Sequence, residues 1–317
     1  MRFLHNVNIN FLAKRRLFYI LSSVLIVLGF SIFLTRGIPL GIDFKGGTEV
    51  LIRFQNEIQV QSVRETMDKI GLAGSEIKTM GNDRDILIRT AEQGEGSTVS
   101  DRIREGIKAN IYGNNFEVLR IDKVGPKIGK ELRLSAVYAT IFSLIAILIY
   151  LALRFEFVYA LGAVVALFHD VLITIGAVAV FDMLFPSLNL ELSQEMIAAF
   201  LTLIGFSTND TVIVFDRIRE NIKLYKNEDI LKVMNKSINT TLSRTIITSG
   251  TVFLTVLILF LFGGEVNRGF AFTFLVGVVT GTYSSVYVAS AFVVDIKYAQ
   301  QKRRVLRSAT RAVGTVK

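Results

Sequence analysis

Two aspartates, Asp170 and Asp210, interrupt long apolar stretches of the 317-residue sequence. An ionisable side chain inside such a stretch is costly, about 2.5 to 3.5 kcal/mol on membrane-insertion scales, and by default it indicates a functional site. Asp210 stands between the largely apolar segments 201–206 and 212–215. Because burial disfavours the charged form of a carboxyl group, a residue in this position can take up and release a proton near neutral pH.

Polar neighbours of these aspartates indicate how their charge is held. The groups that we expect to serve Asp210 are Asn209, Thr208, Thr211 and Arg244. Arg244 opens a later apolar stretch, whose polar stripe is Thr245, Thr248, Ser249 and Thr251. For Arg244, pairing with Asp210 and anchoring its helix at lipid phosphate both remain open. For His169 and Asp170, a structural hydrogen-bonded pair and a proton relay are equally compatible with the sequence.

The residue inventory excludes several kinds of chemistry. The chain has no cysteine and two histidines, so disulfides, thiolate metal sites, cysteine nucleophiles and a histidine-rich metal centre are all excluded. The polar block 36–132 contains no phosphate-binding loop, catalytic triad or metal-ligand spacing. We therefore expect no catalytic residues, no metal and no cofactor, and a binding or mechanical role rather than an enzyme.

Six apolar stretches must position these side chains. Hydrophobic residues make up 51% of the chain, charged residues only 20%, and the mean hydropathy is +0.48. The predicted membrane-spanning helices are 17–35, 133–153, 157–181, 196–215, 245–264 and 269–294. Each is long enough, at about 1.5 Å per residue, to cross a hydrocarbon core of about 30 Å. The first, which follows Arg15 and Arg16, is predicted to be an uncleaved anchor.

The net charge of +9 is concentrated in three segments. Residues 1–16 carry four Lys and Arg, 217–243 is rich in basic residues, and the tail 295–317 carries seven Lys and Arg. The block 36–132 carries 15 groups of each sign. The positive-inside rule therefore places both termini in the cytoplasm and this block outside it. We expect 217–243 to be an amphipathic cytoplasmic segment, and the tail to bind anionic membrane lipid rather than nucleic acid.

The extracytoplasmic block 36–132 shows alternating strand and helix periodicities. The expected strands are 47–54, 76–80, 85–89 and 116–121, and the expected helices are 58–70 and 99–111. This order, βαββαβ, is typical of a small ferredoxin-like α+β domain. The sequence therefore predicts an α-helical polytopic membrane protein with this domain inserted between its first two spanning helices.

Glycine motifs flank the inserted domain and mark the last spanning helix. The motif residues are Gly41, Asp43, Gly46 and Gly47 before the domain, and Gly125, Pro126 and Gly129 after it. Glycine permits tight turns and close backbone approach, so these motifs are either joints between head and membrane or ordinary turns. In the last span, Gly277 and Gly281 form a GxxxG step that predicts close helix packing.

Several motifs together resemble one protein family across essentially the full length of the chain. They are FLAKRR at 11–16, GIDFKGGT at 41–48, VGPKIGKEL at 124–132, LRFEF at 153–157, GFSTNDTVIVFDRIREN at 205–221 and LSRTIITSGT at 242–251. With these motifs the chain resembles the SecF branch of the SecD/SecF family of the bacterial Sec protein-export machinery. The resemblance implies one half of an RND-like arrangement of spanning helices.

The resemblance also implies partners, a location and a mechanism. A SecF-like chain is expected in the bacterial inner membrane with SecD as its partner, working with the SecYEG channel. YidC and YajC are further expected neighbours, SecA acts indirectly, and the substrates are translocating preproteins. The expected role is to use the proton-motive force at late steps of translocation. Asp210 and Arg244 match the family's membrane carboxylate and arginine.

Three alternative functions compete with this interpretation. One is half of an RND-type exporter of small molecules or lipids, which predicts a ligand-lined cleft in a bulky exterior domain. Another is an intramembrane aspartyl protease using Asp170 and Asp210, although the sequence before Asp210 lacks the Gly-x-Gly-Asp pattern of such enzymes. The third is a purely structural assembly subunit, which would tolerate neutralisation of both Asp210 and Arg244.

Overall fold

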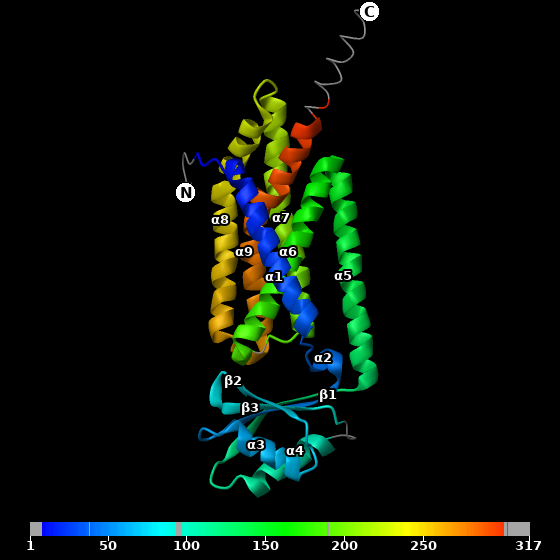
Figure 1. The fold of residues 1–317 in the computed structure, drawn as a ribbon, viewed down its shortest axis with the longest axis vertical. Coiled ribbons are helices and arrows are strands. Elements are labelled where there is room, and N and C mark those ends of the chain that lie inside the picture. The colour runs from blue at the N-terminus through cyan, green and yellow to red at the C-terminus, as the bar shows by residue number, and fades with distance from the viewer. Residues whose placement is uncertain (1–7, 38, 93–96, 189, 301–302, 304–317) are drawn as a thin grey trace, which may run out of the picture.

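Six long apolar helices form the larger part of the molecule in a computed structural model that describes residues 8–37, 39–92, 97–188, 190–300 and 303. Most of the predicted tail and residues 1–7 lie outside the described residues. The helices are α1 (Arg15–Arg36), α5 (Pro126–Arg154), α6 (Phe157–Leu184), α7 (Gln194–Leu224), α8 (Ile230–Phe262) and α9 (Gly264–Ser284) (Figure 1). A π-helical turn, Ser285–Ala289, continues α9. Each of the six is long and apolar enough to span a membrane, which confirms the predicted fold class.

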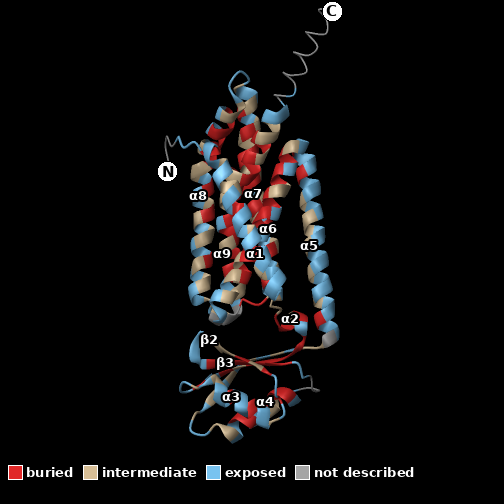
Figure 2. Ribbon diagram, viewed as in Figure 1, coloured by how far each residue is buried: buried red, intermediate tan, exposed pale blue. Residues whose placement is uncertain are grey.

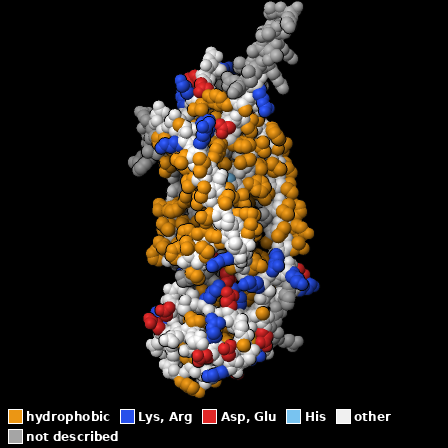
Figure 3. Space-filling model, in the orientation of Figure 1, with side chains coloured by type: hydrophobic (Ala, Val, Ile, Leu, Met, Phe, Trp, Pro, Cys, Tyr) orange, Lys and Arg blue, Asp and Glu red, His pale blue; other side chains and the backbone are white. Residues whose placement is uncertain are grey.

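The helices differ in how deeply they are buried. In its most apolar window, 61% of the last span is buried within the protein, compared with 6% of α5 and 11% of α1. Figure 2 shows the same contrast, because buried residues concentrate in α6, α7 and α9 while α5 is mostly exposed. On the face drawn in Figure 3, the exposed side chains of the helices are largely apolar. Such a large apolar surface indicates contact with lipid or with a membrane partner.

The prediction that 217–243 forms a separate amphipathic segment is wrong. Helix α7 continues through the first part of this segment and ends at Leu224, and α8 begins at Ile230 and runs on without a break into the next span. The apolar positions of the segment, including Ile218 and Ile238, are buried in the same core cluster as the spans. Because this burial continues each helix's apolar face, the basic residues merely line the opposite side of two long helices.

The inserted domain is the predicted α+β unit. Its elements are β1 (Gly47–Phe54), α3 (Val60–Lys69), β2 (Glu76–Met80), β3 (Asn82–Thr90), α4 (Thr98–Asn110) and β4 (Phe116–Val124). The strands form one antiparallel sheet in the order β2-β3-β1-β4. Helices α3 and α4 cover one face of the sheet, and the other face is turned toward the spanning helices (Figure 1). We call this domain the head.

Pairing with neighbouring strands makes two strands longer than the sequence predicted: the added start of β3 pairs with the end of β2, where Asn82 lies opposite Met80. Strand β3 starts three residues before the expected Asp85, and β4 ends three residues beyond the expected Ile121. The added end of β4 pairs with the start of β1, where Gly47 lies opposite Val124. Polar strand ends are hard to predict from local pattern, because their partner strand supplies the hydrogen bonds.

Gly47 is expected to be essential for the sheet. Its φ is +125°, and a Cβ built on it would lie 2.4 Å from the backbone oxygen of Thr90 on β3. Gly47→Ala should therefore weaken the start of β1, at a cost of about 1 to 3 kcal/mol from backbone strain alone. Hydrogen exchange of β1 and β3 in the detergent-solubilised chain measures the effect.

The matched control for Gly47 is Gly125, which lies at the other junction of the head. Gly125 has a φ of −68°, and a Cβ there would meet no atom within 4 Å. Gly125→Ala should leave exchange unchanged. Equal protection of β1 in the Gly47 and Gly125 variants would contradict the assigned role.

Candidate functional site

Asp210 lies in the middle of α7 and is completely buried. Ser249 of α8 donates a hydrogen bond from its Oγ to Asp210 Oδ2, at 3.1 Å. The second carboxylate oxygen, Oδ1, is buried and has no hydrogen-bond partner among the described residues. A buried polar atom without a partner is costly and requires an explanation. A proton on this carboxyl group would reduce that cost, so the environment suits a group that changes its protonation state.

Arg244 lies on α8, five residues before Ser249, and its side chain is exposed. It is close enough to attract the Asp210 carboxylate electrostatically, but the two side chains form no ion pair within the described part of the chain. The expected partnership is therefore one of attraction at a distance, not of contact.

The structure does not bring the expected local donors to Asp210. The side chain of Asn209 is exposed, and Thr211 is buried but forms no hydrogen bond with the carboxylate among the described residues. Consecutive residues of a helix point in different directions, so positions 209 and 211 do not face the partner of position 210. The donor comes instead from α8, and the polar stripe that includes Ser249 was the sequence signal for it.

The second buried aspartate, Asp170 of α6, is fully hydrogen-bonded. Its Oδ1 lies 2.9 Å from His169 Nδ1, and its Oδ2 accepts bonds from Ser207 of α7 at 2.5 Å and Ser284 of α9 at 2.8 Å. These contacts join three central helices around one carboxylate. Both structural and relay interpretations of His169 and Asp170 still fit, because hydrogen-bonded chains serve either purpose.

The network extends through His169 to the first span. His169 Nε2 lies 2.8 Å from Ser22 Oγ of α1 and 3.0 Å from the Tyr283 hydroxyl of α9. Sequence reasoning missed Ser22, Tyr283 and Ser284 as members of this site. The available signal was weak, because single hydroxyl side chains are common in spanning helices and often bond to their own backbone.

Helix α7 connects the two carboxylates. Ser207 donates to Asp170, and Asp210 accepts from Ser249. Ser207 and Asp210 are three residues apart and therefore lie on the same side of α7. Close packing of α9 makes this possible: a Cβ at Gly281 would lie 3.0 Å from the Ser207 side chain, and one at Gly277 would lie 2.6 Å from Leu203. The predicted glycine step therefore faces α7 and lets α9 approach the site.

The GIDFKGGT motif lies between the head and the spanning helices. Its centre is the short helix α2 (Ile42–Lys45). Asp43 Oδ2 accepts a hydrogen bond of 2.8 Å from the backbone N–H of Gln194, the first residue of α7. A carboxylate at a helix N-terminus is stabilised by the unpaired N–H groups and the helix dipole. The motif is thus bonded to the same helix that carries Asp210.

The second motif packs against the first. Gly129, in the first turn of α5, approaches the backbone of Asp43 and Gly46. Arg133 donates to the carbonyl of Phe44, at 2.6 Å. Gly125 adopts an extended conformation just before α5, which begins at Pro126. The two predicted joints therefore meet in one place, at the base of the head.

The described residues show no arrangement suited to a metal. They include no group of three or more His, Cys, Asp or Glu side chains that could hold an ion. Asp170 and Asp210 also hydrogen-bond to different partners and share none in the described residues. This geometry does not favour a protease dyad, in which two carboxylates share one proton.

Comparisons with known proteins agree with this arrangement. The model of the family described as protein export membrane protein SecD/SecF, C-terminal, matches residues 101–299, and the SecD/SecF GG motif matches residues 31–58. The chain belongs to the SecD/SecF family. The GG-motif match of the SecD/SecF family covers α2, and the larger match contains Asp170, Asp210 and Arg244.

Relatives in the SecD/SecF family cover this chain almost completely. The protein translocase subunit SecF of Rhodothermus marinus is 47% identical over 98% of this chain and 100% of its own length. That of Vibrio alginolyticus is 37% identical over 94% of this chain and 92% of its own. Their common description is that of a translocase subunit.

Solved SecDF structures show the same fold. SecDF from Thermus thermophilus, described as a translocon-associated membrane protein, matches with a TM-score of 0.82 and 35% identity over 93% of this chain. A SecDF structure in a super-membrane-facing form matches with a TM-score of 0.68 and 34% identity over 98% of this chain. This chain spans only 40% and 41% of those two chains.

Proposed function

We propose that this chain is the SecF-type subunit of a Sec protein-export machinery and that SecD is its obligate partner. The support is that relatives named protein translocase subunit SecF match it from end to end. The solved SecDF chains are more than twice as long, so a second component would complete the assembly. The exposed apolar surfaces of α1 and α5 offer room for such a membrane partner.

The observation that carries the proposed mechanism is the buried Oδ1 of Asp210, which has no hydrogen-bond partner among the described residues of an apolar helix bundle. One elementary charge that crosses the membrane potential releases about 2.3 kcal/mol per 100 mV. In the proposed cycle, Asp210 takes up a proton from outside and releases it to the cytoplasm. Its changing charge alters the hydrogen bond to Ser249 and the attraction to Arg244, which biases the packing of α7 against α8.

The base of the head supplies the route from that site to the exterior. Helix α7 begins at Gln194, whose N–H is bound by Asp43 of the GG motif. A shift of α7 would therefore move α2 and the head with it. We propose that this movement draws preproteins outward at a late step of translocation through SecYEG, after SecA has driven their insertion.

The proposed orientation follows from charge. Arg15 and Arg16 lie at the start of α1, and Arg217 and Arg219 lie near the end of α7, at the end of the bundle opposite the head (Figure 1). The positive-inside rule then places both termini in the cytoplasm and the head outside the inner membrane.

Co-purification tests the partner assignment. A tagged chain extracted from bacterial membranes in a mild detergent should retain SecD and SecYEG, because the large exposed apolar faces of its helices are then covered. An unrelated tagged six-span protein from the same membranes is the control. Recovery of the chain free of SecD would overturn the proposal, whereas recovery with a small-molecule exporter would favour the RND alternative. YidC and YajC are expected as additional neighbours.

A further inference from the structure

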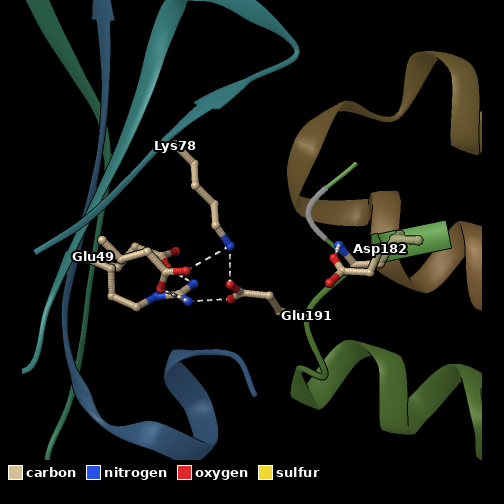
Figure 4. Close-up of polar contacts among 7 residues, drawn as sticks. Glu49, Lys78, Asp182 and Glu191 are labelled. Atoms are coloured by element: carbon tan, nitrogen blue, oxygen red, sulfur yellow. Dashed lines mark hydrogen bonds and ion pairs between the residues drawn. The ribbon is translucent and has the colours of Figure 1, made fainter. Parts of the chain in front are cut away.

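A cluster of five charged side chains lies between the head and the spanning helices (Figure 4). Four belong to the head sheet and one, Glu191, to the loop between α6 and α7. The head members are Glu49 of β1, Glu76 and Lys78 of β2, and Arg89 of β3. The proposed proton mechanism uses none of them.

Glu191 is the centre of the contacts across this interface. One of its carboxylate oxygens accepts a hydrogen bond of 2.7 Å from Lys78 Nζ, and the other pairs with Arg89 Nη1. Within the head, Arg89 also pairs with Glu49 at 2.5 Å and Glu76 at 3.2 Å. The side chain of Glu191 is 5% exposed and that of Arg89 is 9% exposed. The pairs of Arg89 with Glu191 and Glu49 are therefore withdrawn from solvent, whereas Lys78 and Glu76 at the edge of the cluster are partly exposed.

Electrostatics keeps Lys78 and Glu76 charged. Burial alone would lower the pKa of Lys78, but its bonds to Glu191 and Glu76 raise that pKa above its ordinary value. Burial alone would raise the pKa of Glu76, yet the hydrogen bond from Lys78 and the charges of Lys78 and Arg89 lower it. Both groups are consequently ionised at neutral pH, as an ion-pair cluster requires.

A buried ion-pair cluster can hold two parts of a protein together and still separate at a modest net cost in free energy. Taking charges out of water costs several kcal/mol per ion, and this cost largely cancels the attraction between them. Undocking the head would return the same charges to water, so the net cost of separation is modest. A polar cavity of about 90 Å³ adjoins the cluster, lined in part by Glu49, Arg89, Arg120 and Glu191, so the interface is not tightly packed there.

The loop that carries Glu191 is held firmly to the membrane part. Asp182 Oδ1 of α6 accepts a hydrogen bond of 3.1 Å from the N–H of Leu190, just before Glu191. Gly41, in the linker to α2, donates to the carbonyl of Leu192 at 2.8 Å, just after it. Three residues beyond Glu191, α7 begins. Glu191 is thus fixed relative to α7, and its bonds to Lys78 and Arg89 are what join it to the sheet.

We propose that Glu191 pairs with Lys78 and Arg89 to form a latch. The latch holds the sheet face of the head against the N-terminal end of α7, and it opens during each transport cycle. The opening step rests on the proposed export function, whereas the docking contact is independent of it. Glu191 is accordingly a positioning residue, because it acts on the head and not on the transported proton.

Distance measurements on the full chain test the docking contact. The chain has no native cysteine, so spin labels at Tyr112→Cys on the head and Phe185→Cys at the end of α6 are specific. Both positions are exposed. Glu191→Gln keeps the side-chain shape but removes the charge, and it should lower the ratio of docked to undocked head roughly tenfold or more. An unchanged distance distribution would overturn the proposal.

The matched control changes a charge pair inside the head. Arg53 forms two hydrogen bonds of 2.7 Å with Asp85 on the same sheet, and within the described part of the chain neither side chain forms a hydrogen bond or ion pair with the Glu191 loop. Asp85→Asn should leave the distance distribution unchanged. If Asp85→Asn released the head as much as Glu191→Gln, a general loss of head stability would explain both results, and the latch would be disproved.

Cross-linking tests the opening step. A bismaleimide bridge between Asp83→Cys of the head and Leu261→Cys of α8, which line one groove outside the latch, should hold the head docked and abolish export by vesicles, while the untreated variant keeps exporting. Full export by the bridged protein would overturn the opening step. Failure of the proposed function would look different, because the wild-type chain itself would then give no stimulation of export.

Discussion

Asp210→Asn is expected to abolish the stimulation of export by a proton gradient while leaving the fold intact. Asparagine has the size of aspartate and can still accept the hydrogen bond from Ser249, but it cannot take up a proton. At 100 mV, the lost coupling of about 2.3 kcal/mol corresponds to a bias of roughly fiftyfold between two helix arrangements. Without that bias the head has no driven movement.

Inverted membrane vesicles that contain the export machinery provide the measurement. Export of a preprotein is followed with and without an uncoupler of the proton gradient, and the variant should export at the uncoupled rate under both conditions. Asp216→Asn is the matched control on the same helix, because Asp216 is partly exposed and pairs with Arg154 at 2.8 Å. This control should retain the response to the uncoupler.

The outcome also separates the competing functions. Unchanged export and unchanged dependence on the gradient in Asp210→Asn would remove Asp210 from the mechanism. If Arg244→Ala were equally silent, the purely structural subunit would become the better interpretation. A response lost in Asp210→Asn but kept in Arg244→Ala would show that the attraction between the two side chains is dispensable.

Gly29→Val is expected to destabilise the helix bundle more than any other single change in α1. A Cβ on Gly29 would lie 2.4 Å from the Cα of Gly176 on α6, where the backbones of the two helices touch. Gly29 and Ser22 are the buried residues of α1, so the same contact holds Ser22 near His169. Separating the helices costs about 1 to 3 kcal/mol for overpacking, and loss of the buried hydrogen bond adds to it.

Thermal unfolding of the purified chain in detergent measures this effect, with Gly250→Val as control. Gly250 lies within α8, and a Cβ there would meet no atom within 4 Å outside the helix. The control should unfold near the wild-type temperature, whereas Gly29→Val should unfold well below it. Comparable melting temperatures for the two variants would show that α1 and α6 can separate without loss.

The sequence predicted the architecture because hydropathy and periodicity are local properties. Long apolar runs located six helices, and alternating residues in 47–54 and 76–80 located two strands at the observed bounds. The two aspartates stood out for the same reason, since a charge in an apolar run needs no partner to be noticed. The sequence also offered Arg244 as the cation for Asp210, and the resemblance favoured that pairing, but the two side chains form no ion pair among the described residues.

Contacts between distant segments could not be predicted from the sequence. Ser249 and Ser22 serve the two aspartates because of how α8 and α1 are rotated about their axes, and rotation is set by packing of whole helices. The Gly29 and Gly176 crossing was missed for this reason, although the Gly277 and Gly281 step was found. Glu191 lies 102 positions from Arg89, and nothing in either local sequence marks the other as its partner.

The pairing of Gly47 with Val124 has a mechanical consequence. The chain enters the head at Gly47 and leaves it at Val124, and these residues lie side by side at one end of the sheet. The two covalent connections of the head therefore meet at one end of the sheet and, taken alone, would leave the head free to rotate about that point. Contact with Glu191 supplies a second support, which removes that rotational freedom. With both supports engaged, a force on the head is transmitted to α7 as through a rigid body. With the covalent connections alone, the same force would rotate the head instead.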